Sequence, residues 1–469
     1  MKFFKTLLFL ILPFSVFSQT LSGRLSAALS ALAQDDQFIH ASVSMYVVDT
    51  KTNTVAYEKN AQLGLAAAST QKIITSISAF ALLGKAFTYK TIIEYDGKIE
   101  NNILTGNLYF TGSGDPTSGS WRWKQTEQEN IKKQIIAVLK TNHITGIRGD
   151  CIIDDSKWES QATPRGWIWE DVGNYYGAGV WGINWHENQY DLILKPGKKT
   201  GDEVSIIKTE PVMEGVVLLN ELKTGREGSG DNSIIYLPEN ALSGTVRGTV
   251  PAGKETFIVK GSIPYAPALF LKTITTLLAE NKIEHFGKGK LGRDLLVNRQ
   301  LLKFKPTLLY TLQSPTIDSI NYWFLQKSVN LFGEAFIKTI AYEKTGFGSM
   351  DTGLSIIRNF WNSKGIQKSA LKIIDGSGLS PANRLTTYAL VTALQFAKKQ
   401  HWFSSFYSAL PYMHGIKMKD GYISGVRAYT GYVKNKRGVE YTFAFIVNNF
   451  DGSPATVREK MWRVLDILK

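Results

Sequence analysis

Hydrophobic and polar residues alternate along residues 42–58, and the polar stretch DTKTN interrupts the pattern once. This arrangement predicts two β-strands joined as a hairpin. From Ile73 to Leu83 the apolar residues instead recur at helical spacing, and Gly84 follows at the position typical of a helix C-terminal cap. The start of the chain therefore predicts a hairpin followed directly by an apolar helix.

Residues 90–265 show a different pattern, in which short apolar runs alternate with turns rich in Gly, Asn, Asp and Pro. The predicted strands are TIIEYDGKI, GNLYFTG, IRGDCIIDD, YDLILKPG, SIIYLPEN and ETFIVKGSI. One helix is predicted over QENIKKQIIAVLKTN. We interpret this region as a β-rich insertion of one or two domains.

Helical spacing returns after Pro267, in ALFLKTITTLLAENKI, TIDSINYWFLQKSVNLFGEAFIKTIAYEK, MDTGLSIIRNFWNSKG and RLTTYALVTALQFAKKQ. The chain ends with predicted strands VRAYTGYVKN and VEYTFAFIVNNF and a helix over TVREKMWRVLDILK. The opening hairpin and the closing strands can join one antiparallel sheet flanked by helices. At 469 residues the chain is too long for one core. We therefore predict an α/β fold of the α+β type, with a discontinuous domain (residues 19–89 and 266–469) and an insertion at 90–265.

The first 18 residues have the pattern of a secretory signal peptide. Lys2 and Lys5 precede an apolar stretch from Leu7 to Val16, and Ser18 is a small residue that suits cleavage after it. The alternative is an uncleaved membrane anchor. No later segment has the roughly 20 apolar residues that a span needs. We expect an exported protein of the bacterial cell envelope, located in the periplasm.

The mature chain contains a single cysteine, Cys151, so it forms no internal disulfide. Its setting in GDCIIDD predicts a buried structural thiol rather than a nucleophile. An exported protein of this size without disulfides fits a bacterial envelope. The six histidines are scattered, and we predict no metal site.

The formal net charge is +14. A positive surface favours an anionic partner, such as cell-wall glycan with its acids or lipid head groups at a peripheral membrane contact. The alternative is dispersed charge that serves solubility. The basic residues form no helix-long run, which argues against nucleic-acid binding.

Ser69 and Lys72 lie three residues apart, where the stretch AAASTQK enters the predicted helix. On a helix this spacing places both side chains on one face. A serine hydroxyl becomes a good nucleophile when a base takes its proton. A lysine serves as that base when burial and a second cation lower its pKa from about 10.4. Alternatively, the serine caps an ordinary helix and the lysine lies on the surface.

Further stretches supply the partners that this chemistry requires. QKSVNLFGEAF contains Ser328 and Asn330, and GIKMKDGYISGVRAYTGYV contains Lys419 before a predicted strand. The order and type of these elements agree with the Ser-x-x-Lys, Ser-x-Asn and Lys-Thr-Gly set of penicillin-binding enzymes. A third stretch, DGSGLSPANRLT, begins at Asp375, and its turn residues favour a structural role over a chemical one.

With these elements the chain resembles the class C low-molecular-mass penicillin-binding proteins, the type-4 D-alanyl-D-alanine carboxypeptidase/endopeptidase family. The resemblance covers nearly the full mature length through AASTQK, GSGDPT, GDCIIDDSKWE, PRGWIWEDVGNYYGAG, KSVNLFGEAF, DGSGLSPANRLT and SGVRAYTGYV. It implies a penicillin-binding, β-lactamase-like transpeptidase domain with a large insertion between its first two motifs. Residues 90–265 occupy that place.

The resemblance also implies an acyl-enzyme mechanism on peptidoglycan stem peptides and cross-links, without metal or cofactor, and covalent inhibition by β-lactam antibiotics. Ser69 would be the nucleophile and Lys72 its base. Ser328 would relay a proton to the leaving amine, and Asn330 would hold Lys72 and the substrate amide. Lys419 would attract the substrate carboxylate and help to keep Lys72 neutral.

The resemblance further implies that Asp420, Gly421, Tyr422 and Arg427 bind substrate, and that the backbone N–H groups of Tyr422 and of the nucleophile form an oxyanion hole. The chain departs from the family's Lys-Thr-Gly-Thr, with Asp420 and Tyr422 in place of the threonines. An ionised Asp420 only accepts hydrogen bonds and repels a carboxylate. We expect it to pair with Lys419 or Arg427, and Arg427 to take over carboxylate binding. Weak carboxypeptidase activity or a cross-link endopeptidase role would follow.

Two other functions are compatible with the same residues. A β-lactamase or esterase shares the serine, the lysine and a polar third residue, but the long β-rich insertion argues against both. The altered element around Asp420 and the basic charge suggest a catalytically inactive peptidoglycan-binding protein. The presence of Ser69, Lys72, Ser328 and Asn330 argues against that function.

Overall fold

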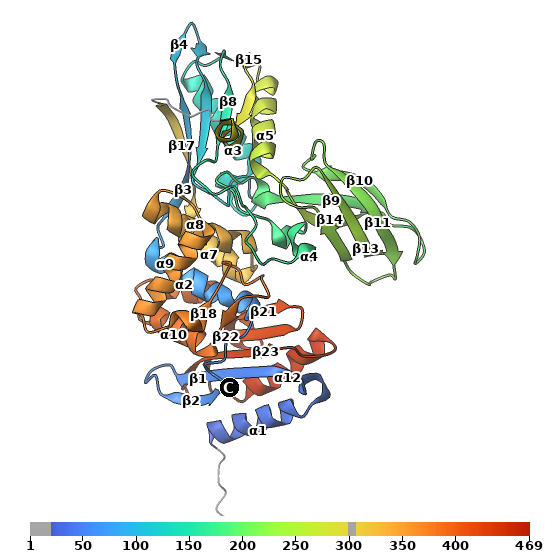
Figure 1. Cartoon of the computed structure of the whole chain (residues 1–469), viewed down its shortest axis with the longest axis vertical. Helices are drawn as coiled ribbons and strands as arrows, with labels where there is room; N and C mark the ends of the chain where they lie inside the picture. Colours follow the sequence, from blue (N-terminus) through green and yellow to red (C-terminus); the bar gives the residue numbers. More distant parts are fainter. Residues whose placement is uncertain (1–19, 299–305) are drawn as a thin grey trace, which may run out of the picture.

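A computed structural model of the chain describes residues 20–298 and 306–469. Figure 1 shows an elongated molecule, with a lower part built from both ends of the chain, an upper part, and a β module that projects to the side. The predicted signal peptide, residues 1–18, lies outside the described residues. Among the helices of the two described ranges, none is long and apolar enough to cross a membrane.

A six-stranded sheet forms the centre of the lower part, with strand order β2-β1-β23-β22-β21-β20. Its strands are β1 (Ser42–Asp49), β2 (Val55–Lys59), β20 (Tyr412–Met413), β21 (Ile416–Ile423), β22 (Val426–Lys434) and β23 (Glu440–Asn448). β1 pairs antiparallel with β23 along its whole length. The structure thus joins the opening hairpin and the closing strands in one antiparallel sheet, as the sequence predicted.

The sheet is apolar on both faces, because alternate residues of a strand point to opposite sides. In β1, Met45 and Val47 belong to one core. Tyr46 and Val48 belong to the other core. Helices cover both faces, and the second layer is the thicker one. The first face carries α1 (Leu21–Ala33) and α12 (Pro454–Asp466), and the second carries α2 (Lys72–Leu82), α7 (Ile317–Gln326), α8 (Asn330–Thr345), α9 (Met350–Ser363), α10 (Thr387–Lys398) and α11 (Phe403–Ala409).

α2 is the central helix of the second layer and is buried along nearly its whole length. It packs against α7, α8 and α10. A helix surrounded in this way needs apolar residues on all sides, which accounts for the apolar run from Ile73 to Leu83. The packing also fixes the N-terminal end of α2, where Lys72 lies.

The upper part lies between β3 (Thr88–Tyr95) and β17 (Thr307–Thr316), which pair antiparallel. It contains two sheets, with orders β15-β7-β5-β4 and β16-β8-β6-β3-β17, that share a core with α3 and α5. The remaining elements are β4 (Lys98–Glu100), β5 (Ile103–Thr105), β6 (Leu108–Gly112), α3 (Gln128–Thr141), β7 (Gly146–Ile147), β8 (Cys151–Asp154), α5 (Ala266–Glu280), β15 (Glu284–His285), β16 (Gly289–Leu291) and α6 (Gly292–Val297).

The side module consists of two three-stranded sheets, β10-β9-β14 and β11-β13-β12. Its strands are β9 (Gln189–Lys195), β10 (Ser205–Glu210), β11 (Val217–Gly225), β12 (Asn232–Tyr236), β13 (Ser243–Pro251) and β14 (Phe257–Ser262). The sequence did not predict β10, β11 and β13. Their residues are largely exposed or half-buried, so they lack most of the apolar signal of a buried strand.

The packing of the elements that follow residue 265 bears on the predicted division into domains. α5 contributes Phe270 and Ile274 to the core of the upper part. β17 joins β3 in an upper sheet. The end of the insertion at residue 265 stays a prediction from the sequence. On this packing we propose that the insertion extends to about Thr316, where α7 begins.

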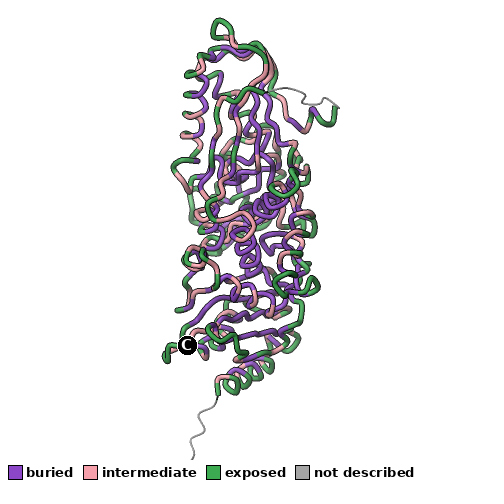
Figure 2. Tube along the Cα trace, turned by 90° about the vertical axis from the view of Figure 1, so that its left-hand side faces the viewer, coloured by how far each residue is buried: buried purple, intermediate pink, exposed green. Residues whose placement is uncertain are grey.

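Buried residues run from the upper part into the lower part (Figure 2). Lys338, on α8, lies at this junction with its side chain 1% exposed. Its Nζ donates to the carbonyl of Gln161 at 2.7 Å and to that of Val180 at 3.2 Å. It also pairs with Glu159 at 3.1 Å. The insertion is therefore anchored on the helical layer by a buried cation.

Candidate active site

Ser69 lies in a short 3-10 turn, η2 (Ala68–Gln71), that leads directly into α2 at Lys72. Lys72 Nζ donates a hydrogen bond to Ser69 Oγ over 2.8 Å. Gln71 is the N-cap residue of α2, and no side chain caps this end of the helix. The alternative of a serine that caps an ordinary helix is therefore wrong.

Two glycines allow neighbouring backbone to approach the turn that carries Ser69. A Cβ at Gly421, in β21, would lie 2.6 Å from the Ala67 carbonyl oxygen and 2.9 Å from the Ser69 nitrogen. A Cβ at Gly378 would lie 2.0 Å from the Ala68 carbonyl oxygen, and Gly378 has a φ of +82°. Only glycine fits such positions without displacement. β21 and the loop around Gly378 thus hold the turn from two sides.

The Lys72 side chain is fully buried, and its Nζ donates three hydrogen bonds. Besides Ser69 Oγ, the acceptors are Asn330 Oδ1 at 2.7 Å and the Ser377 carbonyl at 2.8 Å. The Asn330 amide nitrogen donates to the Tyr176 carbonyl at 2.8 Å. This second bond orients the amide with its oxygen toward the lysine. The structure thus brings Asn330 to Lys72, as expected from the sequence.

The pKa of Lys72 is lowered from its ordinary value to about 7. Burial is the largest cause, and the positive charge of Lys419 is the next. The carboxylates Glu334, Asp375 and Asp420 act in the opposite direction. With a pKa near neutrality, a large fraction of Lys72 is uncharged at pH 7, as a general base requires.

Ser328 interrupts the helical stretch that the sequence predicted as continuous. α7 ends at Gln326, α8 begins at Asn330, and Ser328 between them has a φ of +56°. This left-handed conformation is uncommon for a residue with a Cβ. Ser328 and Asn330 line the same cleft as Ser69. The predicted Ser-x-Asn element therefore lies beside the predicted nucleophile.

The sequence predicted Lys419 before a strand, but it lies within β21, and its side chain is almost completely buried. Its Nζ donates to the Asp420 carbonyl at 2.8 Å and to Asp420 Oδ1 at 2.9 Å. On β22, the Arg427 guanidinium lies 3.9 Å from Asp420 Oδ2. Burial acts to raise the pKa of Asp420, but Lys419 and Arg427 together hold this pKa below its ordinary value. Asp420 is therefore ionised and pairs with both cations.

Glu334, a buried carboxylate on α8, supports the site but was not predicted from the sequence. It accepts hydrogen bonds from the backbone N–H groups of Gly376 at 2.7 Å and Ser377 at 2.9 Å. These bonds hold the loop whose Ser377 carbonyl faces the lysine. Burial, followed by the negative charge of Asp375, raises the pKa of Glu334 above its ordinary value. The available signal was its position one helical turn after Asn330.

Asp375 has the structural role that the sequence favoured, and it also touches the site. It accepts hydrogen bonds from the backbone N–H groups of Gly378 at 2.8 Å and Ser380 at 2.7 Å. It further accepts from Gln71 Nε2 at 2.9 Å and from Trp167 Nε1 at 3.0 Å. Asp375 thus connects its own turn, the turn that carries Ser69 and the insertion.

A cleft of about 980 Å³ opens at Ser69, between the lower part and the insertion. The lower part contributes Ser69, Lys327, Ser328, Val329, Asn330, Leu331, Leu379, Pro381, Tyr422, Ile423 and Ser424. The insertion contributes Trp121, Arg122, Ile168, Asp171, Tyr175, Tyr176, Gln189, Asp231, Ile258 and Lys260. Tyr422 directly follows Gly421, whose close approach to the Ser69 nitrogen places this part of β21 beside Ser69.

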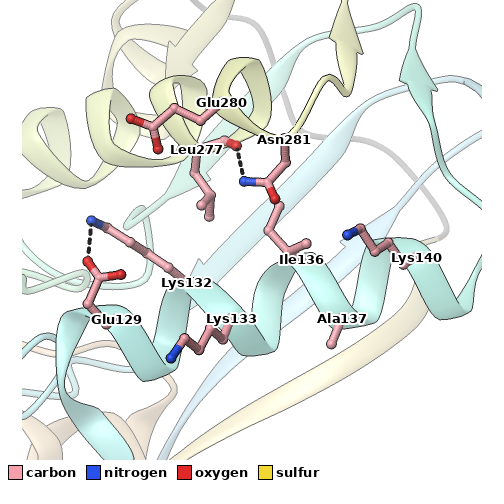
Figure 3. A pocket seen from close by; sticks show the side chains of 9 residues that line it. All are labelled: Glu129, Lys132, Lys133, Ile136, Ala137, Lys140, Leu277, Glu280 and Asn281. Carbon is pink, nitrogen blue, oxygen red and sulfur yellow. Dashed lines mark hydrogen bonds and ion pairs between the residues drawn. The ribbon is translucent and has the colours of Figure 1, made fainter.

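A different hollow, of about 590 Å³, lies between α3 and α5 (Figure 3). It is lined by Glu129, Lys132, Lys133, Ile136, Ala137, Lys140, Leu277, Glu280 and Asn281. Lys132 pairs there with Glu129 at 2.9 Å. None of its lining side chains carries a hydroxyl or a thiol, so it does not offer the predicted nucleophile.

The cysteine and the metal-ligating residue types add no second reactive centre to the described parts of the chain. Cys151 is buried in β8, and burial raises the pKa of its thiol to about 12. This agrees with the predicted structural thiol. Across residues 20–298 and 306–469, no group of three or more His, Cys, Asp or Glu side chains is arranged to hold a metal ion.

Comparison with known proteins identifies the class of this chain. The family model described as the D-Ala-D-Ala carboxypeptidase 3 (S13) family matches residues 25–415. A D-alanyl-D-alanine carboxypeptidase of an Actinomadura species is 25% identical over 461 residues, which cover 91% of this chain and 81% of that protein. D-alanyl-D-alanine carboxypeptidase DacB of Haemophilus influenzae is 23% identical over 440 residues, which cover 87% of this chain and 86% of that protein.

Solved structures share the fold. The crystal structure of penicillin-binding protein 4 from Haemophilus influenzae matches with a TM-score of 0.78 at 20% identity, covering 94% of this chain and 97% of that one. The same protein complexed with a β-lactam matches with a TM-score of 0.72 at 19% identity, covering 95% and 99%. This likeness confirms the predicted penicillin-binding architecture.

Since the family model covers most of its length, the chain belongs to the D-Ala-D-Ala carboxypeptidase 3 (S13) family. It is a serine-type DD-peptidase. The membership confirms the family and enzyme class predicted from the sequence. It decides for the peptidase over a β-lactamase, an esterase or an inactive binding protein.

Proposed function

We propose that this DD-peptidase forms its acyl-enzyme on Ser69, with Lys72 as the general base. The 2.8 Å hydrogen bond between Lys72 Nζ and Ser69 Oγ carries the proposal. It joins a hydroxyl that lines the cleft to a buried amine whose pKa is about 7. Such a pair activates a serine at neutral pH without a histidine.

In the first step, neutral Lys72 takes the Ser69 proton as Oγ attacks the carbonyl of the penultimate D-alanine of a stem peptide or cross-link. The carbonyl oxygen gains negative charge in the tetrahedral intermediate. The backbone N–H groups of Ser69 and Tyr422 are the proposed donors to that oxygen. Their supporting observation is the close approach of β21 to the Ser69 nitrogen at Gly421.

In the second step, the bond to the leaving amine breaks as that amine receives a proton. Ser328 is the proposed relay of this proton from Lys72, supported by its place in the lining of the same cleft as Ser69 and by its position two residues before Asn330, which binds Lys72. Asn330 holds Lys72 through its oxygen and leaves the lysine little freedom to move. Lys419 adds positive potential that helps to keep Lys72 neutral. Water then hydrolyses the acyl-enzyme.

β-Lactam antibiotics are the expected covalent inhibitors, since their strained amide presents a carbonyl to the same serine. The Haemophilus influenzae protein that shares this fold has been crystallised with a β-lactam. We expect a long-lived adduct on Ser69. Rapid release of hydrolysed nitrocefin would instead indicate β-lactamase activity.

The cellular setting proposed for the enzyme is the bacterial periplasm, where peptidoglycan lies. The signal-peptide pattern of residues 1–18 supports this setting. The net charge of +14 supports contact with anionic wall polymer or with lipid head groups at the membrane surface. Both contacts would weaken as salt concentration rises.

The test is digestion of purified peptidoglycan followed by mass spectrometry of the muropeptides. The wild type should remove terminal D-alanine or split cross-linked dimers, and Ser69→Ala should do neither. Ser424→Ala removes another hydroxyl that lines the cleft and serves as the matched control. An Ser69→Ala enzyme that retains wild-type activity would refute the assignment of the nucleophile.

A further inference from the structure

Asp420 places a negative charge in the strand that borders the cleft. The next residue, Gly421, touches the turn that carries Ser69. The charge of Asp420 is close enough to Lys72 to act on the pKa of that lysine. The Asp420 side chain is 33% exposed, and Asp420 lies two residues before Tyr422, which lines the cleft.

The two cations beside Asp420, Lys419 and Arg427, already interact with its carboxylate. Lys419 uses two of its three N–H donors on the Asp420 carbonyl and carboxylate. Arg427 faces the other carboxylate oxygen at 3.9 Å, and its Nε donates to the Tyr429 hydroxyl at 2.9 Å. A substrate carboxylate that enters here competes with Asp420 for the same donors. It is also repelled by the Asp420 charge.

A neutral amide meets different conditions at the same place. It carries no charge for Asp420 to repel, and its N–H donates to a carboxylate that only accepts. The charge of Asp420 therefore distinguishes between two kinds of leaving group. One has a free carboxylate beside the scissile bond, as a terminal D-alanine does. The other has an amide there, as an amidated residue or a continuing chain does.

We propose that Asp420 is a specificity-determining residue, which weakens the binding of leaving groups with a free carboxylate beside the scissile bond and so favours those with an amide in that position. The proposal rests on the acyl-enzyme function proposed for Ser69. It narrows the substrate class of the same site to neutral leaving groups.

The experiment compares two synthetic substrates, an acyl-D-Ala-D-Ala with a free carboxylate and the same peptide as its C-terminal amide. For each enzyme the kcat/KM of the acid is divided by the kcat/KM of the amide. Asp420→Asn should raise this ratio about tenfold, mainly through a lower KM for the acid, as expected for loss of one like charge at close range. Asp420→Glu, which keeps the charge, should retain the wild-type ratio.

The acid-to-amide ratio of kcat/KM is insensitive to indirect effects of the substitution. A changed Lys72 pKa or a loosened strand alters the rates of both substrates and leaves their ratio constant. Asp36→Asn, which removes one exposed carboxylate on the opposite side of the central sheet, should also leave the ratio unchanged. An Asp420→Asn enzyme that reacts with fluorescent penicillin but keeps the wild-type ratio would overturn the specificity role alone. Failure of the wild type to react with penicillin and with both peptides would overturn the acyl-enzyme function as well.

A comparison on the wild type needs no substitution. Acylation by a penicillin with its free carboxylate should exceed acylation by the corresponding methyl ester by less than about tenfold, because Asp420 offsets the attraction of Lys419 and Arg427. A preference for the free acid of about a hundredfold or more would contradict the proposal. Such a preference would require that the residues around Asp420 bind a carboxylate strongly.

Discussion

The proposed role of Lys72 as a base at neutral pH depends on its burial beside a second lysine. We expect the rate of acylation by a fluorescent penicillin to fall as the pH drops below about 7, since Lys72 is increasingly protonated below its pKa. Lys419→Gln removes a positive charge that lowers this pKa, so the midpoint should move to higher pH. Asp420→Asn removes a charge that raises it, so the midpoint should move to lower pH. Labelling rates across the pH range measure both shifts.

The matched control for these pH profiles is Lys434→Gln, at the exposed end of β22. It removes the same charge as Lys419→Gln at a distance from the site, and its midpoint should equal that of the wild type. Shifts of Lys419→Gln and Asp420→Asn in the same direction would show that electrostatic coupling to Lys72 does not set the profile.

Glu334 stabilises the fold by accepting hydrogen bonds from the backbone N–H groups of Gly376 and Ser377. Glu334→Ala leaves both donors buried without a partner, which costs about 2–4 kcal/mol in the free energy of unfolding. Urea unfolding followed by tryptophan fluorescence measures the loss. Glu343→Ala, exposed on the same helix, should change stability by less than about 0.5 kcal/mol. Equal stability of the two variants would refute this role.

At the scale of elements, the site depends on how closely β21 approaches η2. Gly421→Ala places a Cβ 2.6 Å from the Ala67 carbonyl oxygen, so strand or turn must shift. A displacement of about 1 Å at the nucleophile lowers reactivity by about a hundredfold. We therefore expect slow penicillin acylation from a protein that still folds, as judged by its circular dichroism spectrum.

Gly23→Ala is the control for this substitution. Gly23 lies in α1 with its nearest neighbour 3.4 Å from a built Cβ, an ordinary contact distance. Its acylation rate should equal that of the wild type. Unchanged acylation in Gly421→Ala would show that the strand has room to move and that its glycine is not required for the site.

The sequence predicted most elements of the lower part, because buried helices and strands carry strong periodic signals. It predicted one helix where Ser328 separates α7 from α8, since the local residues are compatible with helix and only the surrounding packing selects the break. It missed β11 and β13 of the side module, whose residues are mostly exposed and half-buried. For these two strands the weak signal followed from their low burial.

At the scale of the whole molecule, the insertion forms one wall of the cleft and is anchored by Lys338. Lys338→Met keeps the length of the side chain but leaves the Gln161 and Val180 carbonyls without their donor. We expect a loss of about 3–5 kcal/mol in stability, because one partner of a buried pair with Glu159 is removed. The junction should also be cut faster in limited proteolysis.

Lys344→Met, exposed near the end of the same helix, serves as the control and should be cut at the wild-type rate. If Lys338→Met is as resistant as this control, the upper part is held in place by its apolar contacts. The buried cation would then contribute little to the junction.

The sequence by itself determined the pair Ser69 and Lys72, because both lie within one turn and local backbone geometry sets their distance. It also supplied Asn330 and Lys419 as residue types in the right order. Only the tertiary structure decided that these side chains meet and that the pKa of Lys72 falls to about 7. The physical reason is that burial and neighbouring charge come from segments far apart along the chain. For the same reason the role of Glu334, which binds backbone N–H groups of a distant loop, did not follow from its position one helical turn after Asn330.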